Sequence, residues 1–416
     1  MKRLLRNIHL WLSIPTGIII SLVCFSGAML VFEKELTETI DSEVYFVNET
    51  NSTPLPLQVL MEKVEQTLPD SVSITGLTIS SDPSRAYQVS LSKPRRASIY
   101  LNPYTGEVTG GSNRLPFFHT MFRLHRWLLG LASVPNGIAW GKLLTGCSTL
   151  FLVFILLSGL LMWLTNRHKS LMDSLVIRVS KGWRRFWHDL HVGGGIYATV
   201  FLLAMALMGL TWSFSWYRNA FYSALGVESS DMAKNLSHQQ RSNGEVGSHR
   251  ENHVKLHERS QHLEHQGRSF EGKHAKSDSM TWHTGDAHPH AEEHQHSPYR
   301  PWDEVFAEVA QRNQGYQQIT LKSEVAEVVP NGRRSLRSTD KYLYDRRTGD
   351  ITEVKPYSAE SRTSKVRNYV YMAHTGSWGG LFTRILAFLA ALIGATLPLT
   401  GYWLWLRKRK AKGHRR

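Results

Sequence analysis

Hydrophobic positions along the chain gather into four stretches that contain no charged residue. They cover residues 10–32, 143–164, 192–217 and 385–406, and each is 22 to 26 residues long. A helix of that length crosses the roughly 30 Å hydrocarbon core of a bilayer. The pattern predicts a membrane α-helical protein with four transmembrane helices, and it excludes a soluble globular enzyme.

The distribution of charge predicts how these helices are oriented. The net charge of +15 arises from residues 1–7, 165–187 and 406–416, because the rest of the chain carries equal numbers of basic and acidic residues. Basic loops mark the cytoplasmic side of a membrane. We therefore expect a multi-pass membrane protein with both termini in the cytoplasm and with 33–142 and 218–384 on the far side of the membrane. The same confinement argues against nucleic acid as a partner, and the first stretch is too long for a cleaved signal.

Two polar segments show the same succession of helical and alternating patterns. Residues 57–68 predict a helix, followed by strands at 72–79, 86–91 and 97–101 and a turn at 102–108. The order recurs as a helix at 302–312, strands near 317–321, 324–329 and 341–344, and a turn at 345–351. Each segment predicts a small α+β domain outside the membrane.

The membrane stretches repeat at almost the same spacing as the polar segments. Residues 158–164 match residues 400–406 at an offset of 242, and His9 precedes Gly27 by 18 residues as His191 precedes Gly209. We interpret the chain as a tandem internal repeat about an axis along the membrane normal. The predicted order is helix 1 (1–32), external domain 1 (33–118), an interfacial segment with helix 2 (119–164), a basic loop (165–187), helix 3 (188–217), an external insertion (218–299), external domain 2 (300–373), helix 4 (374–406) and a basic tail (407–416). The glycines at 193–195 are expected to begin helix 3 as a packing or kink feature.

The insertion has a different composition from the rest of the chain. Residues 230–297 lack an apolar period and hold 12 of the 20 histidines. We expect a disordered tract that binds zinc, copper or nickel loosely, because imidazole suits those ions. A dedicated metal site is the less favoured interpretation.

Four of the remaining histidines occupy matched positions at the ends of the predicted helices. His9 and His191 lie at the cytoplasmic ends of helices 1 and 3, and His125 and His374 precede helices 2 and 4 on the external side. A pair of histidines from facing helices can supply both axial ligands of a b-type haem, and no Cys-x-x-Cys-His motif is present for covalent attachment. The pattern predicts two haem b groups, with these four histidines as axial ligands to the iron.

Neighbouring residues leave alternatives open. His188 stands one turn before His191 on the same helical face, so either can be the ligand, although the repeat favours His191. Arg126, with Arg123 and Trp127, is placed to bind the propionates of the external haem. For each residue taken singly, an ordinary role at the membrane interface is the competing interpretation.

These segments together resemble the PepSY-associated transmembrane family. The resembling segments are Ile8-His9-Leu10-Trp11, residues 25–32, Leu124-His125-Arg126-Trp127-Leu128, Asp189-Leu190-His191, Gly195-Ile196-Tyr197, His374-Thr375-Gly376 and, in the first external domain, residues 100–107. The resemblance implies a protein of the bacterial inner membrane, with four membrane helices and two periplasmic PepSY-like domains. For the siderophore-reductase members it also implies haem b that delivers electrons to ferric chelates. The histidine-rich insertion departs from the family pattern.

The expected function is therefore an oxidoreductase that reduces ferric siderophore or another ferric chelate in the periplasm. Reduction of Fe(III) to Fe(II) weakens binding by hard oxygen ligands. Because the chain has no nucleotide-binding motif, the electron donor must be separate, either a membrane quinol or a cytoplasmic reductase docking on the 165–187 loop. The alternative is a non-redox adaptor or regulatory protein that binds a periplasmic partner or metal. A metal permease is disfavoured because the four stretches contain no acidic or amide residue.

Overall fold

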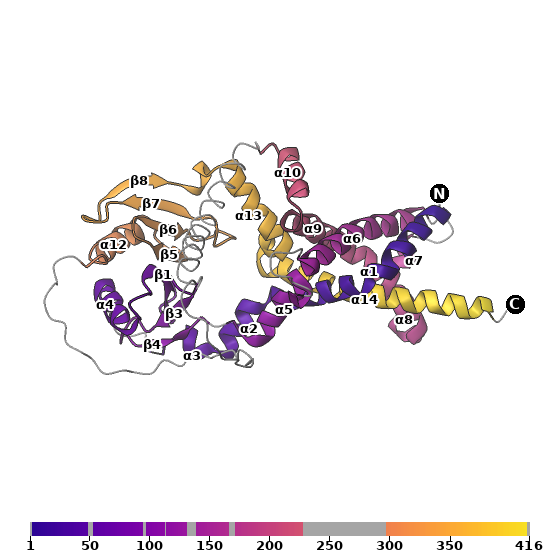
Figure 1. Ribbon diagram of the computed structural model, residues 1–416, viewed down its shortest axis with the longest axis horizontal. Helices are drawn as coiled ribbons and strands as arrows, with labels where there is room; N and C mark the ends of the chain where they lie inside the picture. Colours follow the sequence, from indigo (N-terminus) through magenta and orange to yellow (C-terminus); the bar gives the residue numbers. More distant parts are fainter. Residues whose placement is uncertain are drawn as a thin grey trace, which may run out of the picture. The chain divides into compact units, whose positions relative to one another are not determined.

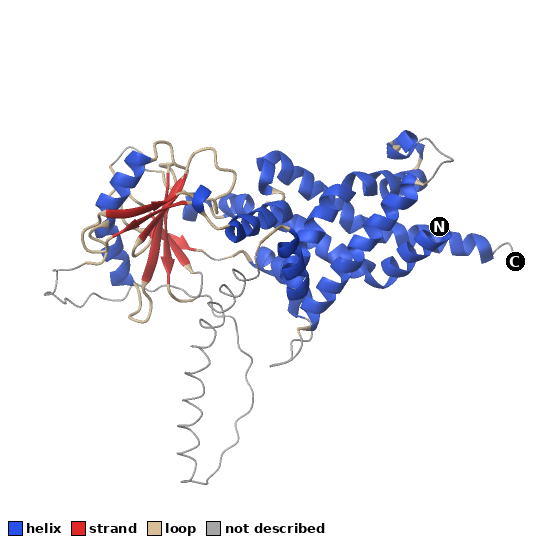
Figure 2. Ribbon diagram, turned by 90° about the horizontal axis from the view of Figure 1, so that it is seen from above, coloured by secondary structure: helices blue, strands red, loops and turns tan. Residues whose placement is uncertain are grey.

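A computed structural model describes residues 2–48, 53–94, 97–112, 114–130, 139–165, 171–227 and 297–413. Of the predicted insertion (218–299), residues 228–296 lie outside these residues, as do His168 and His414. The described chain forms a set of long apolar helices and an antiparallel sheet with its own helices (Figures 1 and 2).

Four helices are long and apolar enough to cross a membrane, which confirms the predicted number. The spans are Arg3–Val31, Trp140–Leu164, Trp183–Ser213 and Ser377–Arg409. They belong to α1 (Lys2–Val31), to α6 (Trp140–Leu164), to α8 (Trp183–Asp189) with α9 (Gly195–Ser213), and to α14 (Gly380–Gly413). The contacts run α1 to α6, α6 to α9, α9 to α14 and α14 to α1, so the helices close into a bundle, and they lie together in Figure 1.

The third span differs from its prediction at the start. The helix begins at Trp183 instead of residue 188, and α8 continues into α9 through a π-helical segment, η3 (Leu190–Gly194). The predicted glycine run therefore lies inside the span. A side chain at Gly193 would come within 3.0 Å of the Ser174 carbonyl oxygen, so glycine is needed where α7 (Leu171–Leu175) passes close to the helix.

Short helices connect the membrane spans to the rest of the chain. Before α6 come α5 (Pro116–Trp127) and η1 (Leu128–Gly130), and before α14 come η4 (Tyr357–Ala359), α13 (Arg362–Thr375) and η5 (Ser377–Gly379). The others are α2 (Glu33–Ile40), α3 (Ser42–Tyr45), η2 (Val179–Lys181) and α10 (Ser215–Ala224). The sequence did not predict α5 and α13 as helices, although they carry His125 and His374.

The two predicted external domains share a single eight-stranded antiparallel sheet. Its order is β4-β3-β2-β1-β5-β6-β7-β8, with β1 (Ile74–Ser80), β2 (Tyr87–Leu91), β3 (Ser98–Leu101), β4 (Val108–Gly111), β5 (Gln318–Leu321), β6 (Val325–Val329), β7 (Asp340–Tyr344) and β8 (Ile351–Lys355). The two halves meet where β1 pairs with β5, with Leu77 opposite Leu321 and Ile79 opposite Ile319.

Each half therefore supplies four strands instead of the three predicted. The additional strands, β4 and β8, are the two edges of the sheet, and their short, exposed sequences lack an alternating apolar pattern. Helix, four strands, short helix and membrane helix follow one another in both halves. The axis along the membrane normal stays a prediction.

One face of the sheet is covered by α4 (Leu57–Thr67) and α12 (Trp302–Arg312), which pack into the same core. Leu60 and Met61 of α4 and Val305 and Val309 of α12 are completely buried there. The helices are also joined by a cap, because Asp303 of α12 accepts hydrogen bonds from the backbone N–H groups at the start of α4, Leu57 at 2.7 Å and Gln58 at 3.1 Å.

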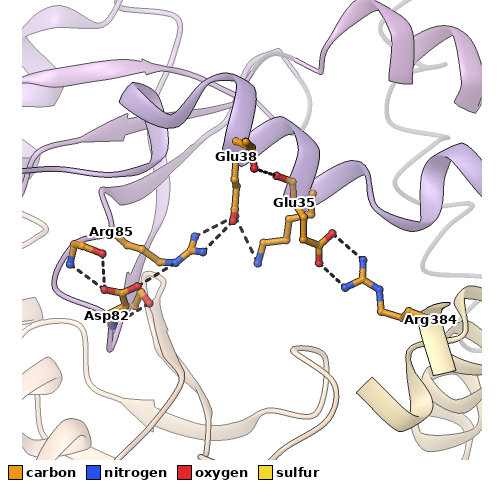
Figure 3. A network of polar contacts seen from close by, with 9 residues as sticks. Glu35, Glu38, Asp82, Arg85 and Arg384 are labelled. Carbon is orange, nitrogen blue, oxygen red and sulfur yellow. Dashed lines mark hydrogen bonds and ion pairs between the residues drawn. The ribbon is translucent and has the colours of Figure 1, made fainter. Parts of the chain in front are cut away.

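A chain of ion pairs runs from the sheet to α14 by way of α2 (Figure 3). The Arg85 guanidinium pairs with both carboxylate oxygens of Glu38 at 3.0 and 2.9 Å, and it also lies 3.8 Å from Asp82. One turn earlier, Glu35 pairs with Arg384 of α14, which also donates to the Val31 carbonyl oxygen. An isolated surface pair is weak, but a network with bidentate geometry stabilises more. The network joins α2 to Arg85 on one side and to Arg384 of α14 on the other.

The cap across the two halves gives a prediction about stability. Asp303→Ala should lower the free energy of unfolding of the sheet by about 1 to 2 kcal/mol, because two N–H groups at the start of α4 lose their acceptor. The measurement is the thermal midpoint of the detergent-solubilised protein followed by circular dichroism. Glu304→Ala is the matched control, because Glu304 is exposed on the same turn; equal shifts for the two variants would contradict the assignment.

Candidate functional site

The structure brings together the two histidines that precede the second and fourth membrane helices. His125 of α5 and His374 of α13 have ring centroids 6.0 Å apart. When two imidazoles bind one metal ion from opposite sides, with each nitrogen about 2 Å from the metal, their ring centroids are about 6 Å apart. We call these residues the sheet-side pair, since their helices follow the edge strands β4 and β8.

Each ring of the sheet-side pair is fixed by a hydrogen bond to a different membrane helix. The Nδ1–H of His125 donates to the Val23 carbonyl oxygen of α1 at 3.0 Å, and that of His374 donates to the Met205 carbonyl oxygen of α9 at 2.8 Å. A carbonyl oxygen can only accept, so Nδ1 carries the proton and the Nε2 atom of the neutral ring is left free to bind a metal.

His9 and His191 form an equivalent arrangement near the other end of the bundle, and we call them the terminus-side pair. His9 Nδ1 lies 3.1 Å from both the Ile155 carbonyl oxygen and the Ser158 hydroxyl of α6. His191 Nδ1 lies 2.9 Å from the Thr400 hydroxyl of α14, and that hydroxyl itself donates to backbone carbonyls, so it accepts from the ring. The two histidines are close enough to interact electrostatically.

A glycine lies beneath each of the four rings. A Cβ atom added at Gly27, Gly209, Gly401 or Gly159 would lie 2.9, 3.1, 3.3 or 3.4 Å, respectively, from Cε1 of His125, His374, His191 or His9. These distances are at or inside the limit of ordinary contact, so a larger side chain at these positions would displace the ring. In each case the glycine and the Nδ1 acceptor belong to the same membrane helix, and helix and ring therefore fit closely.

The two pairs are separated by an apolar layer in the middle of the bundle. Its buried residues come from all four spans and are Ile20, Cys24, Ile155, Leu156, Ala198, Leu202, Ala390 and Ala395. Along α1, His9 and Gly27 are 18 residues apart, which corresponds to about 27 Å of helix. The histidine pairs thus lie at two levels of the bundle.

His188 and His191 have different surroundings in the structure. His188 is 43% exposed and its Nδ1 lies 3.3 Å from the buried carboxylate of Asp189, which is also paired with Arg185. His191 lies in the π-helical segment and faces α14. Segments of this kind are frequent at functional sites, and the contacts favour His191 over His188 as a ligand.

The basic residues near His125 have local partners. The Arg126 guanidinium lies 5.5 Å from the Phe122 ring and 5.1 Å from the Trp127 ring, while Arg123 donates to the Leu129 carbonyl oxygen at 3.0 Å. These contacts are all to residues of α5 and η1, and the role of the two arginines toward haem propionates stays a prediction.

The sequence did not single out Trp212, Ser158 or Thr400 as residues of the site. The Trp212 ring packs edge-on against His374 at 5.1 Å, and Ser158 and Thr400 bind the terminus-side pair. A signal for the last two was present, because both begin the segments that repeat at the 242-residue offset. Their partners could not be identified until the helices were packed.

Burial keeps the sheet-side pair neutral. It lowers the pKa of His125 to about 4, helped by repulsion from His374, and it also lowers the pKa of His374. A neutral imidazole is the form that binds metal ions. Within the described residues no three His, Cys, Asp or Glu side chains gather as a metal site. In a haem, the porphyrin supplies four ligands to the iron and two histidines can supply the remaining two.

The fold and these pairs define a class, a multi-pass membrane protein with two levels of paired histidines and an antiparallel sheet region outside its spans. The family described as PepSY-associated TM region matches residues 6–408. The chain belongs to this family, which confirms the resemblance predicted from the sequence. No curated protein matches the chain.

The fixed tautomer of the sheet-side pair can be measured directly. In protein produced without haem, 15N spectra should show His125 and His374 as neutral Nδ1–H tautomers at pH 7, because their Nδ1–H groups donate to carbonyl oxygens. Both rings should stay neutral below the pH at which a free imidazole titrates, since burial lowers both pKa values, that of His125 to about 4. Single His→Gln variants assign the signals. A neutral Nε2–H form, or protonation near pH 6.5, would show that the rings are not held this way.

Proposed function

We propose that this protein is a haem b oxidoreductase of the bacterial inner membrane that reduces ferric siderophore or another ferric chelate in the periplasm. The observation that carries the proposal is the arrangement of the four histidines. They form pairs at two levels of the bundle, each ring presents a free Nε2, and each ring is anchored to a neighbouring helix through Nδ1.

In this proposal His125 and His374 hold one haem b, and His9 and His191 hold the other. Bound haem b supplies reversible one-electron chemistry at each level. The chain's residues orient the ligands, since a hydrogen bond from Nδ1–H fixes the ring and raises the basicity of Nε2. The glycines allow each ring to lie against its supporting helix, and the apolar layer excludes water between the levels.

The direction of transfer follows from the predicted orientation. Basic residues gather at both termini and in the 165–187 loop, and this supports a cytoplasmic location for these segments and a periplasmic one for the sheet. Electrons enter from a quinol or a cytoplasmic reductase near His9 and His191 and leave near His125 and His374. One electron converts Fe(III) to Fe(II), and the hard oxygen ligands of the chelate then hold iron more weakly.

Four alanine variants test the pairing. His125→Ala and His374→Ala should each remove the same component of the reduced-minus-oxidised visible spectrum, and His9→Ala and His191→Ala should remove the other, because each variant deletes one axial ligand. The measurement is haem content per chain together with the spectrum. His188→Ala is the control and should leave both components.

The same experiment distinguishes the proposed function from the alternative. No haem in protein from a haem-replete host would contradict the oxidoreductase and favour a non-redox adaptor that binds a periplasmic partner or metal. Full haem content in all four alanine variants would mean that the histidines are not the ligands.

The glycines give an independent prediction. Gly27→Ala should reduce haem retention at the sheet-side level by about tenfold, because the new methyl group displaces the ring of His125. Gly195→Ala is the matched control, since its methyl group would lie 3.5 Å from Leu397, an ordinary contact. The measurement is the rate at which haem is lost to a haem-free protein that binds haem tightly. Equal loss rates in the two variants would remove the glycine from the site.

A further inference from the structure

We propose that a basic cavity beside α13 binds an acidic arm of the ferric chelate. The cavity has a volume of about 180 Å³, and its lining includes Arg337, Lys341, Glu360 and Arg367. It lies between β7, η4 and the first turns of α13. The redox part of this inference rests on the function proposed above, whereas the binding of an anion does not.

The charges lining the cavity do not cancel. Lys341 is neutralised by Glu360 at 2.5 Å. Among the described residues, no carboxylate lies within ion-pair distance of Arg337 or Arg367, and the nearby Arg333 has its own partner in Asp340 at 3.6 Å. Arg367 donates a hydrogen bond to the Tyr222 hydroxyl of α10, which is a neutral partner. Neither guanidinium is therefore neutralised by a carboxylate, and guanidinium binds carboxylate and similar planar anions with two parallel hydrogen bonds.

The surroundings of the two arginines are held in place. Arg337 lies 3.7 Å from the centre of the Tyr371 ring. Asn368, which is buried behind the cavity, donates to the Ser338 hydroxyl at 2.8 Å and to the Tyr357 hydroxyl at 3.0 Å. Anchored side chains lose less entropy when a ligand binds. The cavity also adjoins the N-terminal turn of α13, whose dipole favours an anion.

The size of the cavity indicates which part of a chelate it takes. Pockets for whole small molecules usually have volumes of about 300 Å³ or more. A cavity of about 180 Å³ suits one carboxylate-bearing arm, while the metal centre stays outside. A metal chelate with a net negative charge and carboxylate oxygens at its surface is therefore the chemical class that fits best.

The position of the cavity on α13 relates it to the sheet-side pair. Arg367 and His374 are seven residues apart on this helix, which corresponds to about 10 Å. Tyr371 lies between them, one turn from each. A chelate anchored at Arg337 and Arg367 is thus held about two helical turns from a proposed haem ligand. One electron passing from the reduced protein to Fe(III) gives Fe(II), and no bond of the organic ligand has to break.

Binding is tested with a chelate that cannot be reduced. Calorimetry with the anionic Ga(III)–EDTA complex and full-length protein should give an affinity that Arg337→Gln and Arg367→Gln each weaken about tenfold, since each removes a charged hydrogen-bond donor. Arg347→Gln, which removes an exposed charge from the β7–β8 turn, should bind as wild type. Arg367→Lys should retain part of the affinity because it keeps the charge.

Turnover tests the same site with a different readout. Arg367→Gln should raise KM for Fe(III)–EDTA about tenfold with kcat and haem content unchanged, and it should leave reduction of the uncharged ferric maltolate as in wild type. Unchanged Ga(III)–EDTA binding in both glutamine variants, or an equal effect on charged and uncharged chelates, would overturn the site. Absence of haem would overturn the proposed function instead, and binding of Ga(III)–EDTA would still show whether the cavity binds the anionic chelate.

Discussion

The hydrogen bond from each histidine Nδ1 to an oxygen of the neighbouring membrane helix is the interaction on which the rest of the structure depends. It joins α5 to α1, α13 to α9, α1 to α6 and the π-helical segment to α14. An unpaired polar group is costly within a bilayer, so the bond specifies which helices lie together. The bond also leaves Nε2 unprotonated, so the packing of the bundle determines which nitrogen of each ring can bind a metal.

A second constraint acts outside the spans, where β1 pairs with β5 and makes one sheet from two distant segments. The strands at its two edges, β4 and β8, are those that lead into α5 and α13. The two halves of the chain therefore send corresponding helices to the same end of the bundle, where His125 and His374 meet. The cap from Asp303 to α4 joins the two halves beside the sheet, and the ion pairs of α2 join the sheet region to α14.

Much of this architecture could be predicted from the sequence because its signals are local. Four uncharged stretches predicted four spans, and alternating segments predicted six of the eight strands to within a few residues. The edge strands β4 and β8 were missed, since none of their residues is buried and they carry no apolar alternation. The helix α13 was missed because its apolar residues form only a weak helical pattern, whereas α5 was missed although its apolar residues recur with the helical period and a proline stands in its first turn.

For the site, the sequence by itself determined which histidines are equivalent, because matched spacing in the two halves is a property of the chain alone. Only the tertiary structure decided that His125 faces His374, that His191 binds Thr400 of α14 while His188 lies beside Asp189, and that Ser158, Thr400 and four glycines support the rings. It also placed Arg337, from the connection between β6 and β7, beside the same cavity as Arg367 on the helix of His374. The physical reason is that a ring's orientation and partners depend on helices brought together by packing, and the spacing within one helix carries no information about its neighbours.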